Sequence, residues 1–193
     1  ILYLNPLQKA LQSDGETDFS HLLGKIGRVC SELSVPIIVK EVGWGISEDV
    51  ARKLAAVGVA AIDVAGSGGT SWSEVEKHRA NNELAARIAA SFSTWGIPTA
   101  ESIEMVKRGA PGVTIIASGG IRSGIDLAKA IALGVQVGGI GAPLLKLAMT
   151  SAKAVEEYLI GVREELRISM FCIGAANVAQ LRDSPYLNKK RLQ

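Results

Sequence analysis

The sequence is poor in the residues on which several common classes of protein depend. Aromatic residues make up 5% of its 193 residues and all hydrophobic types 48%, which predicts a globular protein with a core of aliphatic side chains. The net charge is only +2, so neither nucleic acid nor an anionic membrane surface is expected as a partner. The two cysteines, Cys30 and Cys172, fit neither a CxxC motif nor a zinc spacing, so we expect free thiols in a reducing cytoplasm.

Several familiar membrane and catalytic signals are also missing. No apolar run is long enough to cross a bilayer, and no signal peptide is recognisable. There is no Ser–His–Asp arrangement, no pair of metal-binding histidines and no P-loop lysine–serine pair. His21 and His78 stand in polar, helix-like stretches, so we assign neither a catalytic role. The chain opens on the strand-like segment ILYLN without a methionine, from which we expect it to be part of a longer protein.

What the sequence does contain is an alternation of short apolar runs and helix-like segments. Strands are predicted at 1–7, 36–42, 60–65, 97–99, 114–117 and 136–140. Helices are predicted at 19–33, 48–57, 73–79, 101–108, 123–133, from 142, at 152–173 and shortly after 177. This alternation predicts a parallel sheet covered by helices, and therefore the α/β class.

Two architectures fit such a sheet, an open doubly wound sheet and a (β/α)₈ TIM barrel. Polar and glycine-rich residues recur at the C-terminal ends of several strands, whereas an open sheet would concentrate them at one switch point, so we predict the barrel. A barrel needs eight strands and the sequence offers about six, so we expect only its C-terminal portion, about strands 4 to 8. Residues 1–176 would form this part of a single TIM-barrel domain, and 177–193 a C-terminal helix and tail.

The segment ASGGIRSGIDLAKAIALG joins a predicted strand to a predicted helix through two glycines and an arginine. Glycine lets backbone N–H groups approach a ligand closely, a helix N-terminus favours an anion, and arginine adds further donors. Gly119, Gly120, Ile121 and Arg122 therefore form a candidate phosphate cradle. The alternative is an ordinary turn between a strand and a helix.

Lys40 ends the strand-like run VPIIVK, where an unpaired buried ammonium would be costly. We expect it to point into the barrel mouth, toward an electron-rich ring or a phosphate; the alternative is an ion pair with Glu41 or another carboxylate. Gly68–Thr70 form a second loop rich in donors, followed by Trp72, which could cover an apolar ligand or belong to the core. Two glycine loops and a strand-end lysine indicate a phosphate-bearing planar cofactor, and FMN fits best, with its phosphate at Gly119–Arg122.

Three further polar residues could face the same mouth. Glu76 lies four residues after Trp72, which predicts that they share a helix face; the alternative is a surface carboxylate. Asn5 and Gln8 follow the first strand and carry both donors and acceptors. They could orient a substrate, relay a proton or cap a turn.

The motifs LNPLQ, VPIIVKEVGWGIS, DVAGSGGTSW, WGIPTA and ASGGIRSGIDLAKAIALG together resemble the type 2 isopentenyl-diphosphate Δ-isomerase family, from the first residue to about Gly174. The resemblance implies an FMN-dependent barrel enzyme of longer chain that forms a homo-oligomer in the cytoplasm. It implies interconversion of isopentenyl diphosphate and dimethylallyl diphosphate in isoprenoid biosynthesis without net redox change. It also implies that the FMN is reduced by NADPH and that the enzyme requires Mg²⁺.

The resemblance further implies roles for individual residues. Asn5 and Gln8 would bind the substrate, and Gln8, Trp72 and Glu76 would be catalytic. Trp72 and Glu76 would lie near the reacting carbons, Gln8 or Glu76 would carry a proton, and reduced flavin would protonate the alkene. The implied FMN contacts are Lys40, Ala65, Thr70, Gly119, Gly120, Ile121, Arg122, Gly141 and Ala142.

The sequence departs from the family pattern HLNxxQE at two positions. Tyr3 stands where a histidine is usual, and Lys9 stands where the family has a glutamate that binds magnesium. Because an ammonium cannot ligate Mg²⁺, no metal ligand is assigned, and Lys9 could instead pair with a diphosphate oxygen.

Two other functions stay open beside the isomerase. One is an FMN-dependent oxidoreductase of the 2-hydroxy-acid oxidase type, which shares the GG–R phosphate site but needs a histidine–arginine pair at the mouth. The other is an inactive, truncated copy that keeps a phosphate site without turnover. Without the family's N-terminal half, activity of this chain alone is doubtful.

Overall fold

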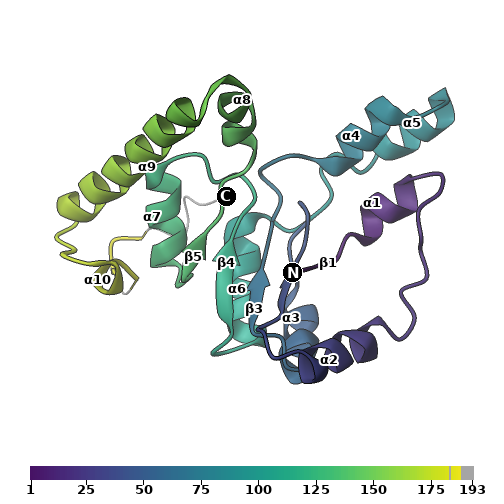
Figure 1. The fold of residues 1–193 in the computed structure, drawn as a ribbon, viewed down its shortest axis with the longest axis horizontal. Coiled ribbons are helices and arrows are strands. Elements are labelled where there is room, and N and C mark those ends of the chain that lie inside the picture. The colour runs from purple at the N-terminus through teal and green to yellow at the C-terminus, as the bar shows by residue number, and fades with distance from the viewer. Residues whose placement is uncertain (183, 188–193) are drawn as a thin grey trace.

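The computed structural model describes residues 1–182 and 184–187, and its centre is a five-stranded parallel sheet (Figure 1). The strands lie side by side in chain order, β1 to β5, so each joins its neighbour through a helical crossover. Their bounds are β1 Leu2–Tyr3, β2 Ile38–Lys40, β3 Ala61–Asp63, β4 Thr114–Ala117 and β5 Val137–Gly138. A sheet of this topology is the arrangement found in a segment of a (β/α)₈ barrel.

The helices form groups around this sheet. In Figure 1, α7 and α9 lie next to each other beside β5, while α1, α4 and α5 lie together toward the β1 end, and α3 packs against α6. The first five are α1 Pro6–Leu11, α2 Leu22–Glu32, α3 Glu48–Ala56, α4 Trp72–Arg79 and α5 Glu83–Ala90. The others are α6 Thr99–Gly109, α7 Gly124–Ala132, α8 Ala142–Thr150, α9 Ala152–Cys172 and α10 Val178–Arg182.

The core is aliphatic, as the composition predicts. Val39 of β2 and Ile62 of β3 have no exposed surface, and Ile115 of β4 is 3% exposed. Helices contribute the opposing layer, with Leu54 of α3 and Val106 of α6 almost fully buried. The central strands are mostly apolar, and the charged residues Lys40 and Asp63 stand at the carboxyl ends of β2 and β3.

Helix starts are set by side chains that the sequence displays. Ser47 accepts a hydrogen bond from the Val50 amide at the start of α3, which confirms the predicted N-cap. Ser123 and Asp126 form a capping box at the start of α7, so the helix after the GG–R turn begins one residue later than its predicted first residue. The long predicted helix at 152–173 is present as α9.

Two local predictions are wrong, and one helix was missed. The strand predicted at 1–7 covers only Leu2–Tyr3, because Pro6 supplies the fixed φ of a first helical turn and α1 begins there. The strand predicted at 97–99 is a single bridge between Ser67 and Pro98, after which α6 begins. Helix α5 was not predicted; Asn82 caps it by accepting from the Ala85 amide.

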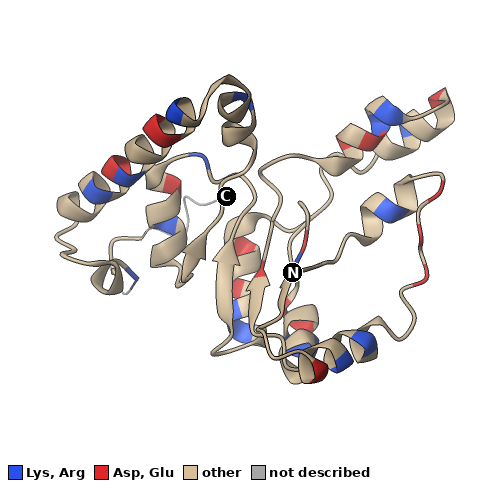
Figure 2. Cartoon of the chain, in the orientation of Figure 1, with Lys and Arg blue, Asp and Glu red and all other residues tan. Residues whose placement is uncertain are grey.

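The two ends of the sheet are exposed. Tyr3 on β1 is 63% exposed and Val137 on β5 is 47% exposed. In Figure 2, acidic and basic residues alternate along the ribbon of α9. None of the helices in the described ranges has the length and apolarity that a membrane span requires. Of the segment predicted as a C-terminal tail, residues 183 and 188–193 lie outside the described residues.

Candidate flavin site

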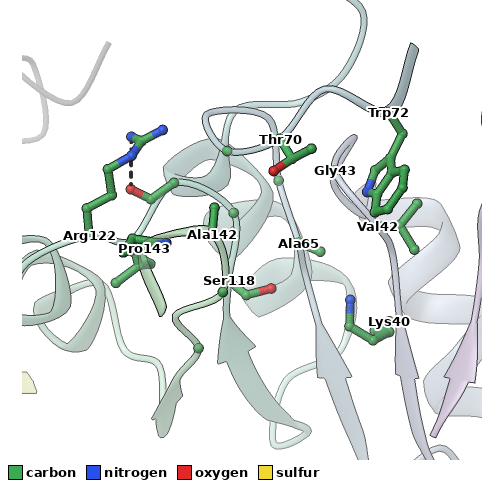
Figure 3. Close-up of a pocket in the computed structure, with 17 residues that line it drawn as sticks. Lys40, Val42, Gly43, Ala65, Thr70, Trp72, Ser118, Arg122, Ala142 and Pro143 are labelled. Atoms are coloured by element: carbon green, nitrogen blue, oxygen red, sulfur yellow. Dashed lines mark hydrogen bonds between the residues drawn. The ribbon is translucent and has the colours of Figure 1, made fainter. Parts of the chain in front are cut away.

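A cavity of about 270 Å³ lies at the carboxyl ends of β2, β3 and β4 (Figure 3). Its walls are the loops that follow these strands, together with the turn after β5. All of the predicted FMN contacts line it: Lys40, Ala65, Thr70, Gly119, Gly120, Ile121, Arg122, Gly141 and Ala142. Trp72 lines it as well, on the side of Val42 and Gly43. The structure therefore brings together residues that are spread over about half of the sequence.

Two glycine loops meet along one wall of this cavity, and their contact depends on the absence of side chains. A Cβ at Gly119 would lie 2.2 Å from the Gly66 carbonyl oxygen, and one at Gly69 would lie 2.9 Å from the Gly120 nitrogen. Gly119 and Gly120 also have φ values of +94° and +81°, which other residues rarely adopt. Glycine is thus required here both for the backbone conformation and for the close approach of the loops.

Thr99 joins the two loops at the start of α6. Its hydroxyl donates to the Gly119 carbonyl at 2.6 Å and lies 3.5 Å from the Ser67 carbonyl oxygen. A residue on a third element thus fixes the spacing between the loops. Sequence reasoning missed Thr99, because the WGIPTA segment gives no sign that it turns back onto the other loop.

Arg122 spans the same two loops. Its guanidinium donates to the Gly68 carbonyl at 3.1 Å and contacts the Gly120 carbonyl at 3.4 Å. The backbone N–H groups of Arg122 and Ser123 donate to the Asp126 carboxylate, each at 3.1 Å. Because Asp126 takes these donors at the start of α7, an anion in the cavity would meet the glycine loop and the arginine rather than the helix end itself.

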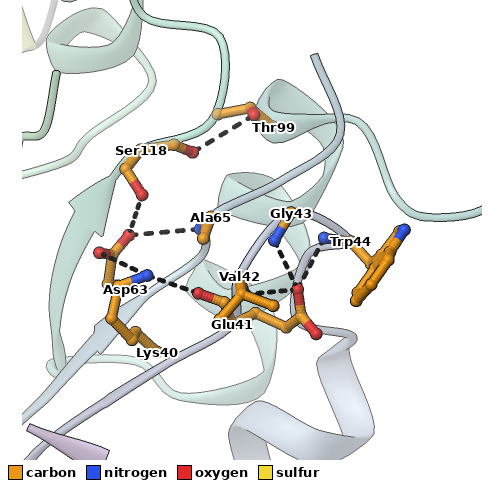
Figure 4. A network of polar contacts seen from close by, with 9 residues as sticks. All are labelled: Lys40, Glu41, Val42, Gly43, Trp44, Asp63, Ala65, Thr99 and Ser118. Atoms are coloured by element: carbon orange, nitrogen blue, oxygen red, sulfur yellow. Dashed lines mark hydrogen bonds and ion pairs between the residues drawn. The ribbon is translucent and has the colours of Figure 1, made fainter. Parts of the chain in front are cut away.

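Lys40 points toward the cavity and has a carboxylate partner (Figures 3 and 4). Its ammonium lies 3.8 Å from the Asp63 carboxylate, donates to the Glu41 carbonyl at 2.6 Å and lies 5.5 Å from the centre of the Tyr3 ring. The sequence left open a pair with Glu41 or another carboxylate, and the structure shows Asp63 in that position. Tyr3 contributes a cation–π contact to Lys40.

The Glu41 carboxylate shapes the loop after β2 rather than pairing with Lys40. One of its oxygens accepts from the amides of Val42, Gly43 and Trp44 at 2.7, 2.8 and 2.6 Å. Glu41 is 5% exposed, and this burial raises the pKa of its carboxyl above the ordinary value although the three amides oppose the shift. The bonds fix the loop that supplies Val42 and Gly43 to the cavity wall.

A second polar cluster joins α1 to α4. The Gln8 and Gln12 side-chain amides both donate to the same oxygen of Glu76, Oε1, each at 3.0 Å. Asn5 donates to the Gln8 amide oxygen at 3.4 Å. Three of the residues predicted for substrate binding and catalysis, Asn5, Gln8 and Glu76, therefore form one hydrogen-bonded chain.

The predicted common face of Trp72 and Glu76 is only partly present. Trp72 lines the 270 Å³ cavity, whereas Glu76 turns toward α1 and lines a separate polar cavity of about 410 Å³ with Gln12 and Arg79. Trp72 is the first residue of α4, so its side chain leaves the helix toward the preceding loop. Glu76 is 8% exposed, which rules out the alternative of a surface carboxylate.

Comparison of the chain with known proteins shows the family to which it belongs. Residues 8–189 match the family described as FMN-dependent dehydrogenase. The chain belongs to this family. It is 52% identical over 182 residues to the isopentenyl-diphosphate delta-isomerase of a Synechococcus strain, covering 94% of this chain and 52% of that protein. It is 48% identical over 189 residues to the protein of that name from a Nostoc strain, covering 98% of this chain and 54% of that protein. The chain thus spans about half the length of the curated relatives it matches.

Solved structures of the same fold include two oxidases. A Pediococcus acidilactici protein described as a lactate oxidase superposes with a TM-score of 0.65 at 23% identity, over 89% of this chain and 41% of that one. A mandelate oxidase superposes with a TM-score of 0.61 at 23% identity, over 83% and 41%. This likeness shows the fold alone and confirms the predicted class: the chain is part of an α/β barrel.

The two histidines and Lys9 lie away from the cavity. His21, at the start of α2, and His78, in α4, are both exposed and neither lines the cavity, so the histidine expected of a 2-hydroxy-acid oxidase is not supplied by these two. Lys9 lies half-buried in α1. Within 1–182 and 184–187, no group of three or more His, Cys, Asp or Glu side chains could hold a metal ion.

Two more residues of the site were missed from the sequence, Asp63 and Gln12. Asp63 ends β3 directly opposite Lys40 in the strand register, and an acid inside the apolar run AAIDVA was a signal that could have found it. Gln12 gave no comparable signal, because it reaches Glu76 only across 64 residues of sequence.

Proposed function

We propose that this chain forms the larger part of the flavin site of an isomerase that interconverts isopentenyl diphosphate and dimethylallyl diphosphate, with reduced FMN as its acid–base cofactor. The observation that carries the proposal is the single cavity that collects two glycine loops, Lys40, Thr70 and Arg122 at the strand ends. Membership of the FMN-dependent dehydrogenase family and the names of relatives about 50% identical support it.

The residues of the cavity suit FMN. Glycines at 69, 119 and 120 let the two loops pack closely along the cavity wall, where their backbone N–H groups would meet a phosphate, and Arg122 adds a cation. Gly141 and Ala142, after β5, would complete the phosphate contacts. Lys40, Ala65 and Thr70 would contact the flavin ring.

The isomerisation adds a proton to one carbon of an allylic system and removes one from another, so hydrogen atoms and electrons balance without an external oxidant. When bound, reduced FMN supplies a proton donor and an electron-rich ring beside the cation-like transition state. The protein must exclude water and place a second proton-carrying group at the opposite end of the substrate. Trp72 would cover the apolar part of the substrate, since it lines the cavity wall.

We propose that Glu76 carries the second proton, although its carboxylate lines the polar cavity beside α1 and not the cavity that holds Lys40 and Arg122. Gln8 and Gln12 both donate to Oε1, so they hold the carboxylate in place while Oε2 is the oxygen proposed to exchange the proton. Asn5 and Gln8 would orient the substrate, and their mutual hydrogen bond couples substrate contact to the position of Glu76. Gln8 would thus act in both binding and catalysis.

The proposal also covers the reductant of the flavin and the metal ion. We propose that NADPH reduces the flavin once, before turnover begins. A protein-held Mg²⁺ does not fit the described residues: they offer no group of three acidic or histidine side chains, and Lys9 occupies the position of the family's glutamate. Lys9 is proposed to contact the substrate diphosphate directly.

We also propose a homo-oligomer in the cytoplasm. Large apolar side chains stay exposed on the outer helices, among them Leu145 at 70%, Met149 at 84% and Phe171 at 80%. Cys30 and Cys172 are free thiols, which suits a reducing compartment.

An anaerobic assay tests the isomerase proposal. The protein, at the full length its gene encodes, is incubated with FMN, NADPH and isopentenyl diphosphate, and dimethylallyl diphosphate is measured. We expect product from the wild type and at least a hundredfold less from Glu76→Gln, as is typical when a proton-transfer group is lost. Product formation undiminished in Glu76→Gln would contradict the assigned role. In a separate aerobic assay, oxygen consumption with a 2-hydroxy acid would instead indicate the oxidase, and FMN binding without either activity would indicate an inactive copy.

A further inference from the structure

We infer that Asp63 is a positioning residue of the flavin site, which acts through Lys40 and is itself fixed by Ser118. The inference rests on the proposed function, because it concerns the lysine proposed to contact the flavin ring. Asp63 is 8% exposed, and a buried carboxylate of this kind requires partners that compensate for its lost hydration. Its partners are Lys40, Ala65 and Ser118 (Figure 4).

The Asp63 carboxylate has three polar partners, and all three can donate a hydrogen bond. The Ser118 hydroxyl donates to Oδ1 at 2.6 Å, the Ala65 amide donates to the same oxygen at 3.2 Å, and the Lys40 ammonium lies 3.8 Å from Oδ2. One oxygen is therefore anchored to the protein and the other is turned to the lysine. A carboxylate with one oxygen bonded to the protein and the other facing the ammonium can hold that cation in a fixed direction.

The strand register explains why these residues meet. Lys40 pairs with Asp63 across β2 and β3, and Ser118 follows directly after β4, the other neighbour of β3. Asp63 thus stands at the end of the middle strand, between two residues that both line the cavity. The carboxylate links the lysine side of the cavity to the loop that carries Gly119 and Gly120.

A positioning role is favoured over simple core packing. Lys40 and Asp63 side chains are 22% and 11% exposed, so the pair lies at the boundary between the core and the cavity rather than deep inside. The flexible stem of a lysine needs a fixed partner to hold its ammonium in one place. The Glu41 carbonyl is one such partner, and Asp63 supplies the charged one.

The first test measures Lys40 without any flavin. Full-length protein is labelled briefly by reductive methylation, and modification at Lys40 is quantified by peptide mass spectrometry. We expect Lys40 to be modified faster in Asp63→Asn than in the wild type, because the ammonium is released toward solvent. Ser118→Ala should show a smaller change in the same direction. Unchanged Lys40 labelling in both variants would overturn the inference.

The second test is a double-mutant cycle on FMN affinity, followed by flavin fluorescence. Asp63→Asn and Lys40→Met should each weaken FMN binding about tenfold, and the double variant should be no weaker than Lys40→Met alone. Additive losses would show that Asp63 acts independently of Lys40 and would overturn the inference.

Two control variants distinguish an effect on the position of Lys40 from a general loss of protein stability. Asp49→Asn removes an exposed carboxylate paired with Lys53 at 2.6 Å, and Ser102→Ala removes a fully buried hydroxyl outside the cavity. Neither should alter Lys40 labelling or FMN affinity, whatever it does to unfolding. If the wild type binds no FMN, the proposed function fails, while the labelling test still decides whether Asp63 holds Lys40.

Discussion

Replacing Gly119 by alanine should separate two requirements that the glycine loops meet at once. Gly119 has a φ of +94°, and a Cβ there would lie 2.2 Å from the Gly66 carbonyl oxygen, 2.7 Å from the Gly66 nitrogen and 2.9 Å from the Thr99 hydroxyl. Gly112 has a φ of +90°, and a Cβ added there would meet nothing within 4 Å. Gly112→Ala is therefore a matched control that carries the backbone strain without the clash.

The expected magnitudes follow from these contacts. A left-handed conformation costs alanine about 1–2 kcal/mol, and the reduced freedom of the unfolded chain returns about 0.4–1 kcal/mol, so Gly112→Ala should lower the free energy of unfolding by about 1 kcal/mol. Forcing the two loops apart adds about 1–3 kcal/mol, so Gly119→Ala should lower it by about 2–4 kcal/mol. Only Gly119→Ala should also weaken FMN binding.

Urea unfolding of both variants, followed by far-UV circular dichroism, measures the difference. Flavin fluorescence on the same preparations reports FMN affinity. Equal destabilisation by the two substitutions, with equal FMN affinity, would refute the close packing of the loops and with it the geometry of the cavity wall.

Three further predictions concern residues that do not line the cavity. Ser102→Ala should lower the free energy of unfolding by about 2 kcal/mol, which urea unfolding measures. The Ser102 hydroxyl bonds the Ile46 amide at 2.7 Å and the Ile46 carbonyl at 2.9 Å, and the substitution removes both hydrogen bonds from the core. Burial raises the pKa of Glu41 above its ordinary 4.5, so its contribution to stability is complete below pH 4.5 and is lost as the pH rises through the raised value. Urea midpoints from pH 4 to 8 should therefore fall relative to those of Glu41→Gln, and parallel profiles would contradict this. Gln12→Leu should lower kcat for the isomerisation with little change in KM, since Gln12 touches Glu76 and not the proposed substrate contacts.

Much of the fold is visible in the sequence because local signals agree with the tertiary structure. The runs that became β2, β3 and β4 are short, apolar and bounded by glycine or proline, and their helices carry recognisable caps such as Ser47 and Ser123. The cavity follows from the same reasoning, since the carboxyl ends of adjacent parallel strands must meet at one edge. The resemblance of the motifs then added Ala65, Gly141 and Ala142.

What the sequence could not supply depends on contacts between distant segments. Residues 97–99 form only the bridge between Ser67 and Pro98, and Thr99 lies against Gly66 and Gly119, a contact that no local pattern encodes. The choice of Asp63 rather than Glu41 as the partner of Lys40 depends on the strand register. The direction of Glu76 is likewise fixed by amides on α1 rather than by its spacing from Trp72.

The central claim is that the glycine loops and Lys40 form a flavin site, and an FMN titration tests it most directly. Full-length protein is titrated with FMN, and quenching of flavin fluorescence is followed for the wild type, Lys40→Met and Gly119→Ala. The account predicts saturable binding to the wild type and clearly weaker binding to both variants. Absence of saturable binding to the wild type, or equal affinity in all three proteins, would contradict it.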